Sequence, residues 1–121
     1  MLIKNFFKSF RYAARGLRYV FKHEQNFRWQ LAVSLIVIIL MFWFPLSTRE
    51  IVMVIILITM VLTMEILNTA LERFADLLKP RLHEYVSVIK DIMAAAVLLT
   101  SLSAGIIGAI IFIPHFMAWF K

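Results

Sequence analysis

The chain has 121 residues, of which 63% are hydrophobic, and its formal net charge at pH 7 is +6. A soluble domain of this length does not place so much of its sequence in apolar residues, so the composition indicates an integral membrane protein that forms one domain over residues 1–121. The absence of cysteine excludes disulfides, thiolate metal sites and cysteine nucleophiles.

The first predicted element is an amphipathic helix over about residues 4–25. Phenylalanine and aliphatic side chains share one face, and basic side chains recur at steps of four and three on the neighbouring face: Lys4, Lys8, Arg11, Arg15, Arg18 and Lys22. Such a helix lies at a membrane surface and is attracted by anionic lipid. Its basic stripe is also suited to hold phosphate groups. Because the segment lacks a small-residue cleavage site, we expect no signal peptide.

Glu24 is the only acidic residue among the first 49 residues. It has two interpretations. In the first it is a local partner for Lys22 or Arg28, which contributes little at a surface. In the second the surface helix continues as far as Glu24 and turns this carboxylate toward other helices, where it has a function.

Three long apolar stretches follow, each near the length that spans a bilayer: residues 29–46, 51–71 and 92–113. Pro45 ends the first stretch, and the short link after it makes the first two spans an antiparallel pair. Pro80 is expected to end the second helix. Of the Lys and Arg residues, seven precede the first span and four lie between the second and third, against one in the short link. This asymmetry places the N-terminus and the later connection in the cytoplasm.

Glu65 lies near the end of the second apolar stretch. In a helix that enters the membrane at Ile51, its position is roughly 21 Å along the axis, within or at the edge of a core about 30 Å thick. Charge at that depth is costly, so an intramembrane glutamate indicates function. Asn68, Glu72 and Asp76 follow on the same helix face.

These residue types suit phosphoryl transfer to a lipid hydroxyl. Glu65 has the position of a general base for an alcohol that lies just below the headgroups. Glu24 and Glu72 supply carboxylates of the kind that bind Mg²⁺ together with nucleotide phosphates. Lys90 is suited to neutralise charge on the transferred group. For Asp91 a structural role, as an acid in the first turn of the third helix, is an equal alternative, and Asp76 also has a structural alternative.

Several known sites are excluded. With only three glycines, the chain has neither a P-loop nor a glycine-rich kinase loop, so a nucleotide must be bound by helix side chains and Mg²⁺. The three histidines show no metal-ligand spacing. Because membrane topology explains the basic residues, we expect no binding of nucleic acid.

The sequence resembles the bacterial membrane-integral diacylglycerol kinase/undecaprenol kinase family. Three motifs carry the resemblance: Glu24-x-Asn26-Phe27-Arg28, the block Glu-Ile-Leu-Asn-Thr-Ala-Leu-Glu from Glu65 to Glu72, and Lys90-Asp91. The resemblance covers nearly the whole chain. It implies an all-α homotrimer in the bacterial inner membrane, with three transmembrane helices and a surface helix per subunit, and with active sites on the cytoplasmic side that neighbouring subunits share.

The resemblance also implies roles for individual residues. Glu65 matches the catalytic base, and Asn68, Lys90 and Asp91 match polar site residues, the last two near the phosphates. Glu24 and Glu72 match the carboxylates that hold Mg–ATP. Nucleotide contacts are matched by Tyr12 and by the loop segment Arg81-Leu82-His83. Asn5 stands where some members have an arginine that helps to bind ATP, so Lys4 or Lys8 is the candidate substitute.

Two departures concern the acceptor lipid. Ala94 stands where diacylglycerol-type members have a serine, and Gln30 stands where they have an acid. The sequence therefore favours undecaprenol as acceptor, with diacylglycerol as the alternative. A small oligomeric channel or assembly subunit, with Glu65 and Asn68 along a polar seam, is a remote alternative. That hypothesis does not explain why the acidic residues and Lys90 gather at one membrane face.

Overall fold

The computed structural model describes residues 2–121, and within this range the chain forms four helices and no strand. The helices are α1 (Leu2–His23), α2 (Gln25–Trp43), α3 (Thr48–Leu78) and α4 (His83–Trp119). Each of the last three is long and apolar enough to cross a membrane. The predicted fold class, an amphipathic helix followed by three transmembrane helices, is confirmed.

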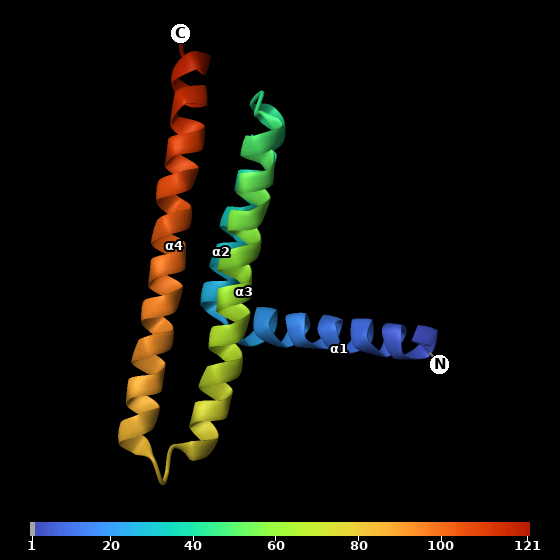
Figure 1. The fold of residues 1–121 in the computed structure, drawn as a ribbon, viewed down its shortest axis with the longest axis vertical. Coiled ribbons are helices and arrows are strands. Elements are labelled where there is room, and N and C mark those ends of the chain that lie inside the picture. The colour runs from blue at the N-terminus through green and yellow to red at the C-terminus, as the bar shows by residue number, and fades with distance from the viewer. Residues whose placement is uncertain (1) are drawn as a thin grey trace.

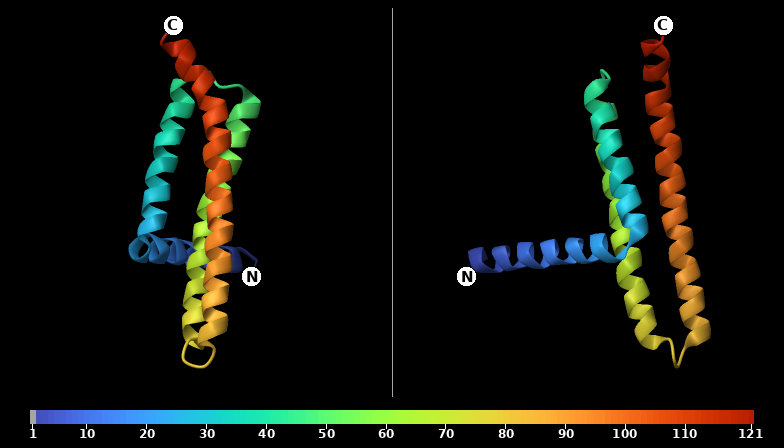
Figure 2. Two further views of the ribbon diagram at one scale, coloured as in Figure 1. Left: turned by 90° about the vertical axis from the view of Figure 1, so that its left-hand side faces the viewer. Right: turned by 180° about the vertical axis from the view of Figure 1, so that it is seen from behind.

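The four helices form an antiparallel bundle of three with one helix set crosswise. Figures 1 and 2 show α3 and α4 as a long hairpin, with α2 beside the part of α3 that lies away from the hairpin turn. The amphipathic α1 leaves the bundle where α2 begins, partway along α3 (Figure 1). With 31 residues α3 is about 46 Å long, which exceeds the bilayer core of about 30 Å. The α3–α4 turn therefore projects beyond the level of the surface helix.

Local chemistry sets the helix ends. Ser47 caps α3: its hydroxyl accepts from the backbone N–H of Glu50 at 3.2 Å, while the Glu50 carboxylate accepts from the backbone N–H of Ser47 at 3.0 Å. Pro45 follows the end of α2 at Trp43, and Pro80 follows the end of α3 at Leu78. Both prolines lie where a helix cannot continue.

The only cluster of buried apolar side chains in residues 2–121 lies at the end of the bundle opposite the hairpin turn. It joins all three long helices through Met41, Phe44, Val54, Ile111 and Phe112. Elsewhere large apolar side chains are exposed along the spans, for example Ile110 at 67%. In a membrane protein such faces contact lipid or further subunits.

Helices α3 and α4 extend beyond the apolar stretches of the sequence at both ends, whereas α2 begins earlier than its stretch and ends at Trp43, before the predicted end at residue 46. The fourth helix begins at His83, so Asp91 is not in its first turn, as the structural alternative assumed; the acid there is Glu84. That prediction was wrong because hydropathy marks where a helix enters lipid, whereas a polar helix continues in water. The surface helix, in turn, ends at His23 and does not include Glu24.

Candidate functional site

Glu24 forms the hinge between the surface helix and the first span. Its backbone is extended, with φ −115° and ψ 110°, and it is the single residue between α1 and α2. The guanidinium of Arg28 donates to the carbonyl oxygens of Phe21 at 2.7 Å and Lys22 at 3.1 Å, which satisfies the carboxyl end of α1. The local ion pair of Glu24 with Lys22 or Arg28 is therefore not what the structure shows.

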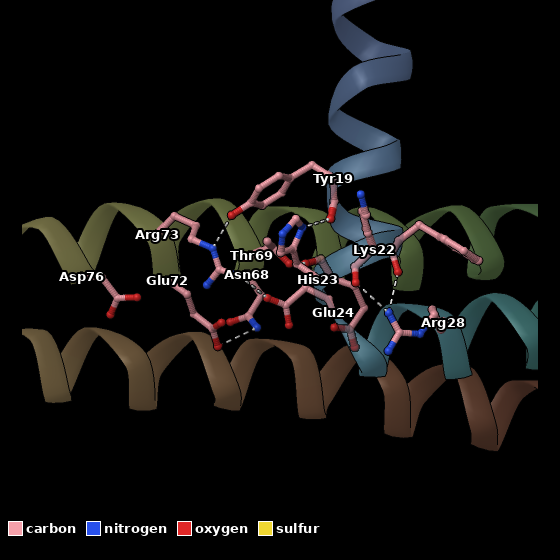
Figure 3. Close-up of polar contacts among 12 residues, drawn as sticks. Tyr19, Lys22, His23, Glu24, Arg28, Asn68, Thr69, Glu72, Arg73 and Asp76 are labelled. Carbon is pink, nitrogen blue, oxygen red and sulfur yellow. Dashed lines mark hydrogen bonds and ion pairs between the residues drawn. The ribbon is translucent and has the colours of Figure 1, made fainter.

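The partner of Glu24 is Arg73, 49 residues further along the chain. Nη2 of Arg73 donates to Oε1 of Glu24 at 3.2 Å, and Nε of Arg73 donates to the hydroxyl of Tyr19 at 2.8 Å (Figure 3). These contacts dock the end of the surface helix on α3 at the height of Arg73. Because α1 is the amphipathic helix, this height marks the membrane surface along α3.

Glu65 lies eight residues before Arg73 on α3, which places it about 12 Å further into the bundle. The residue is only 4% exposed. Thr69 fixes the local backbone, because its hydroxyl donates to the carbonyl oxygen of Glu65 at 3.0 Å. The polar pairs formed nearby use other carboxylates, and none of them uses that of Glu65. A buried carboxylate below the surface helix is thus available to a substrate.

Glu24 and Glu72 lie nearer the membrane surface than Glu65, because Glu24 contacts Arg73 and Glu72 immediately precedes Arg73 on α3. The amide of Asn68 donates to Oε1 of Glu72 at 3.3 Å, one helical turn away, and Figure 3 shows both side chains beside that of Glu24. The negative charges of Glu24 and Glu72 both act on the Glu65 carboxyl. The hinge and one face of α3 therefore carry the acidic side chains of Glu24, Glu65 and Glu72 together with Asn68.

Beyond these acids lies a second, more basic group between α3 and α4. Nζ of Lys90 donates to Oδ1 of Asp76 at 2.8 Å. This hydrogen bond holds the pKa of the Asp76 carboxyl below its usual value. A cavity of about 260 Å³ opens beside the pair. Its lining includes Lys79, His83, Ser87, Lys90 and Asp91.

Two predicted nucleotide contacts are not joined to this site within one chain. Tyr12 lies on the exposed part of α1, 62% exposed, with the Arg15 guanidinium 5.7 Å from the centre of its ring. Along α1 it is about 18 Å from Glu24. Arg81 and Leu82 are exposed in the α3–α4 turn, while His83 lines the cavity.

Sequence reasoning did not identify Arg73, Tyr19 or Lys79 as members of the site. The partners Arg73 and Tyr19 are 54 residues apart and belong to different helices. No periodicity within one helix indicates such a pair. In the sequence, Lys79 is only one of the four basic residues that indicate a cytoplasmic connection between the second and third spans. Its place on the cavity wall depends on how α3 packs against α4.

The acidic group suits a shared metal rather than a metal held by the protein alone. Within residues 2–121 no group of three or more His, Cys, Asp or Glu side chains has the geometry to hold a metal ion. Mg²⁺ does not require one, because it commonly binds through one or two carboxylates together with substrate phosphates and water. The hard oxygen donors of Glu24 and Glu72 fit that requirement.

A second cavity, of about 320 Å³, runs between the three long helices. It begins at Gln30 and Ser34 on α2 and at Val61, one turn from Glu65 on α3. It continues toward the opposite membrane face, past Gly105 and Phe112 of α4, and its lining is mainly apolar. Its shape and chemistry suit a lipid chain whose polar end lies near Glu65.

Comparison with known proteins gives a consistent result. A family model described as prokaryotic diacylglycerol kinase matches residues 11–112. The undecaprenol kinase of Bacillus subtilis is 36% identical over 112 residues, which cover 93% of this chain and 91% of that protein. The diacylglycerol kinase of Synechocystis is 33% identical over 115 residues, covering 94% and 66% respectively. The diacylglycerol kinase of Escherichia coli K12 is 30% identical over 109 residues, covering 90% and 89%.

Proposed function

The chain belongs to the prokaryotic diacylglycerol kinase family and is a membrane lipid kinase, and we propose that it phosphorylates undecaprenol with ATP to give undecaprenyl phosphate. Family membership leaves no support for the channel hypothesis. The buried Glu65 supports the kinase proposal most directly. Its carboxylate is suited to accept a proton, and it lies at the depth where the hydroxyl of a membrane lipid is expected.

In the proposed reaction, Glu65 accepts the proton of the lipid hydroxyl while that oxygen attacks the γ-phosphorus of ATP. The bond between the γ-phosphorus and the bridging oxygen breaks, and ADP leaves. Most of the catalytic effect in such transfers comes from positioning and from stabilising charge. Asn68 and the apolar cavity orient the acceptor, and Lys90 and Asp91 lie on the phosphate side.

Mg²⁺, held by Glu24 and Glu72 together with the phosphates, would supply positive charge against the charge of the transferred group. The carboxylates themselves approach from two directions, one from the α1–α2 hinge and one from α3. Neither carboxylate belongs to a metal site formed by the protein alone within residues 2–121, so a metal bound to them would keep positions for nucleotide phosphates. We expect substitution of either by glutamine to raise the Mg²⁺ concentration needed for half-maximal rate.

The nucleotide site requires residues that one chain does not bring together. We propose that the enzyme is a homotrimer in the cytoplasmic membrane, with its sites facing the cytoplasm and shared between neighbours. The distance along α1 between Tyr12 and Glu24 supports this arrangement, as do the apolar faces left exposed on the spans. In the assembly Tyr12 and Arg81–His83 would contact the ATP of a site that another subunit helps to form.

Gln30 is the better candidate for acceptor choice. It lines the cavity that ends near Glu65, whereas Ala94 does not. The amide of Gln30 both donates and accepts hydrogen bonds, whereas the acid that diacylglycerol-type members have at this position only accepts, so the residue here alters how the polar end of the acceptor is held. Diacylglycerol remains the second candidate, because two of the relatives above are diacylglycerol kinases.

The test is transfer of labelled γ-phosphate from Mg–ATP by the purified protein in mixed micelles, with undecaprenol and diacylglycerol offered separately. Preference for undecaprenol is expected, and Gln30→Glu should shift the ratio of kcat/KM toward diacylglycerol. Preference of the wild type for diacylglycerol would refute the proposed acceptor. An unchanged ratio in Gln30→Glu, with Ala94→Ser as the comparison, would remove the role of Gln30.

A further inference from the structure

Arg73 connects α3 to the end of α1 and to the hinge residue Glu24. Its guanidinium contacts Glu24 at 3.2 Å and the Tyr19 hydroxyl at 2.8 Å, and its carbon lies 5.7 Å from the centre of the Tyr19 ring. Figure 3 shows these contacts bridging from α3 to the end of α1 and to the hinge. The proposed mechanism assigns no role to Arg73 or Tyr19.

Tyr19 is itself held in place. Its ring stacks on that of His23, with centroids 4.2 Å apart and planes at 25°. Nδ1–H of His23 donates to the backbone carbonyl of Tyr19 at 2.9 Å. The Tyr19 ring is therefore already ordered, so that Tyr19 loses little conformational freedom when its hydroxyl accepts from Arg73.

The Glu24 carboxylate needs such a partner. It projects from a hinge rather than from a helix, its side chain is 21% exposed, and the neighbouring acids Glu65 and Glu72 are like charges. Repulsion and side-chain entropy both favour rotation of this carboxylate away into water. A hydrogen-bonded cation opposes both effects.

We propose that Arg73 is a positioning residue for Glu24. It engages Oε1 and does not occupy Oε2, so that Glu24 is oriented before Mg–ATP arrives. This inference rests on the proposed role of Glu24 as a metal carboxylate. Arginine suits the task because its planar fork presents separate donors, Nε to Tyr19 and Nη2 to Glu24, in a fixed geometry. Ligating carboxylates commonly have such outer partners.

The first measurement is binding of Mn²⁺ with a non-hydrolysable ATP analogue, followed by electron paramagnetic resonance, in wild type and Arg73→Gln. Loss of an outer partner of a metal ligand lowers metal affinity by about 10- to 100-fold, and we expect a change near the lower limit. Tyr19→Phe should give a smaller loss, because the charge on Arg73 remains. Arg73→Lys should recover part of the affinity.

Kinetics separate positioning from a general structural role. Arg73→Gln should raise the Mg²⁺ concentration for half-maximal rate by about tenfold while the KM for the lipid stays unchanged. The matched control is Arg49→Gln, an exposed arginine in the first turn at the other end of α3. The same charge change there should leave both parameters as in the wild type. The proposal would be overturned if Arg73→Gln raised the KM for the lipid and lowered metal affinity and thermal stability to a similar degree.

A double-mutant cycle tests whether Arg73 acts through Glu24. In a Glu24→Gln background, Arg73→Gln should cause no further loss of metal affinity, whereas independent effects would add. Additive losses would refute the inference and leave the kinase assignment intact. Unchanged metal affinity in Glu24→Gln alone would instead refute the proposed metal site, on which the inference rests.

Discussion

Glu65 is the residue on which the proposed chemistry depends most. The structure buries it to 4% exposure and leaves its carboxylate out of the pairs formed by Glu24, Glu72 and Asp76. A carboxylate in this setting has no structural partner to lose, which supports a role toward the substrate rather than in the fold. Its removal should therefore affect turnover and not assembly.

We expect Glu65→Gln to lower kcat by at least about a hundredfold, the usual contribution of general base catalysis. Binding of the Mn–nucleotide complex and the oligomeric state should stay as in the wild type, because glutamine keeps the shape of the side chain. Phosphate transfer in mixed micelles and size-exclusion chromatography provide the two measurements. Retained turnover would show that another group accepts the proton.

The Asp76–Lys90 pair has a structural effect that depends on pH. Asp76 lies beyond the predicted span at residues 51–71, and its pKa is below the usual value because Lys90 donates to it. A lowered folded-state pKa means that the pair stabilises the fold at pH values above the unfolded-state pKa, and that this stabilisation is lost as pH falls through the folded-state pKa.

Asp76→Asn should accordingly have a lower Tm than the wild type at neutral pH, and the difference should disappear in acid. The effect is small, because both partners are exposed and surface ion pairs contribute little. Thermal unfolding in detergent across pH 3–8 measures it, with Glu84→Gln as the control for a carboxylate on the same hairpin. A constant difference across that range would show that the pair does not couple stability to protonation.

At the scale of elements, the hinge and the α3–α4 hairpin determine what the residues can do. The extended backbone at Glu24 turns the chain from the membrane surface into the first span, and it presents a carboxylate to α3. The hairpin carries Lys79, Lys90 and Asp91 beyond the level of the surface helix, where a water-soluble nucleotide has access. Under the proposal, the cavity between α2, α3 and α4 holds the apolar part of the lipid acceptor.

The cavity gives a prediction about the acceptor. A Cβ at Gly105 would have no atom within 4 Å, so the single chain tolerates a larger residue there. Gly105→Leu should fill part of the cavity and raise the KM for undecaprenol by about tenfold, the equivalent of about 1.4 kcal/mol of lost binding free energy. The KM for Mg–ATP should not change, and kinetics with each substrate varied in turn measure both. Equal effects on both substrates would show a general distortion.

At the scale of the whole molecule, one chain is an incomplete enzyme under the proposal. Large apolar side chains on all three spans are exposed, and Tyr12 is remote from the acidic group along α1. A symmetric oligomer would cover such faces and bring a neighbour's residues to each site. These features support the proposed homotrimer.

Mixed oligomers test the shared site, provided that Tyr12→Ala alone lowers activity. Co-expression of Tyr12→Ala subunits with Glu65→Gln subunits in equal amounts should restore about a quarter of wild-type activity, because in a closed ring a quarter of the sites then combine intact residues from two neighbours. Each variant expressed alone is the control. Absence of recovery would place Tyr12 and Glu65 of one site in the same chain.

The sequence by itself determined the helices, the membrane spans and the acidic face of α3, because these follow from hydropathy, helical periodicity and residue type, all of which are local along the chain. It also indicated Glu24 and Glu72 as carboxylates near Glu65. The sequence did not determine where Glu24 would point: the local pairing with Lys22 or Arg28 was plausible, and only the approach of α1 to α3 joined it to Arg73 and Tyr19. The place of Gln30 on the lipid cavity and of Lys79 beside Lys90 likewise depends on the packing of separate helices. Such contacts join residues distant in sequence, and their geometry is fixed by tertiary structure alone.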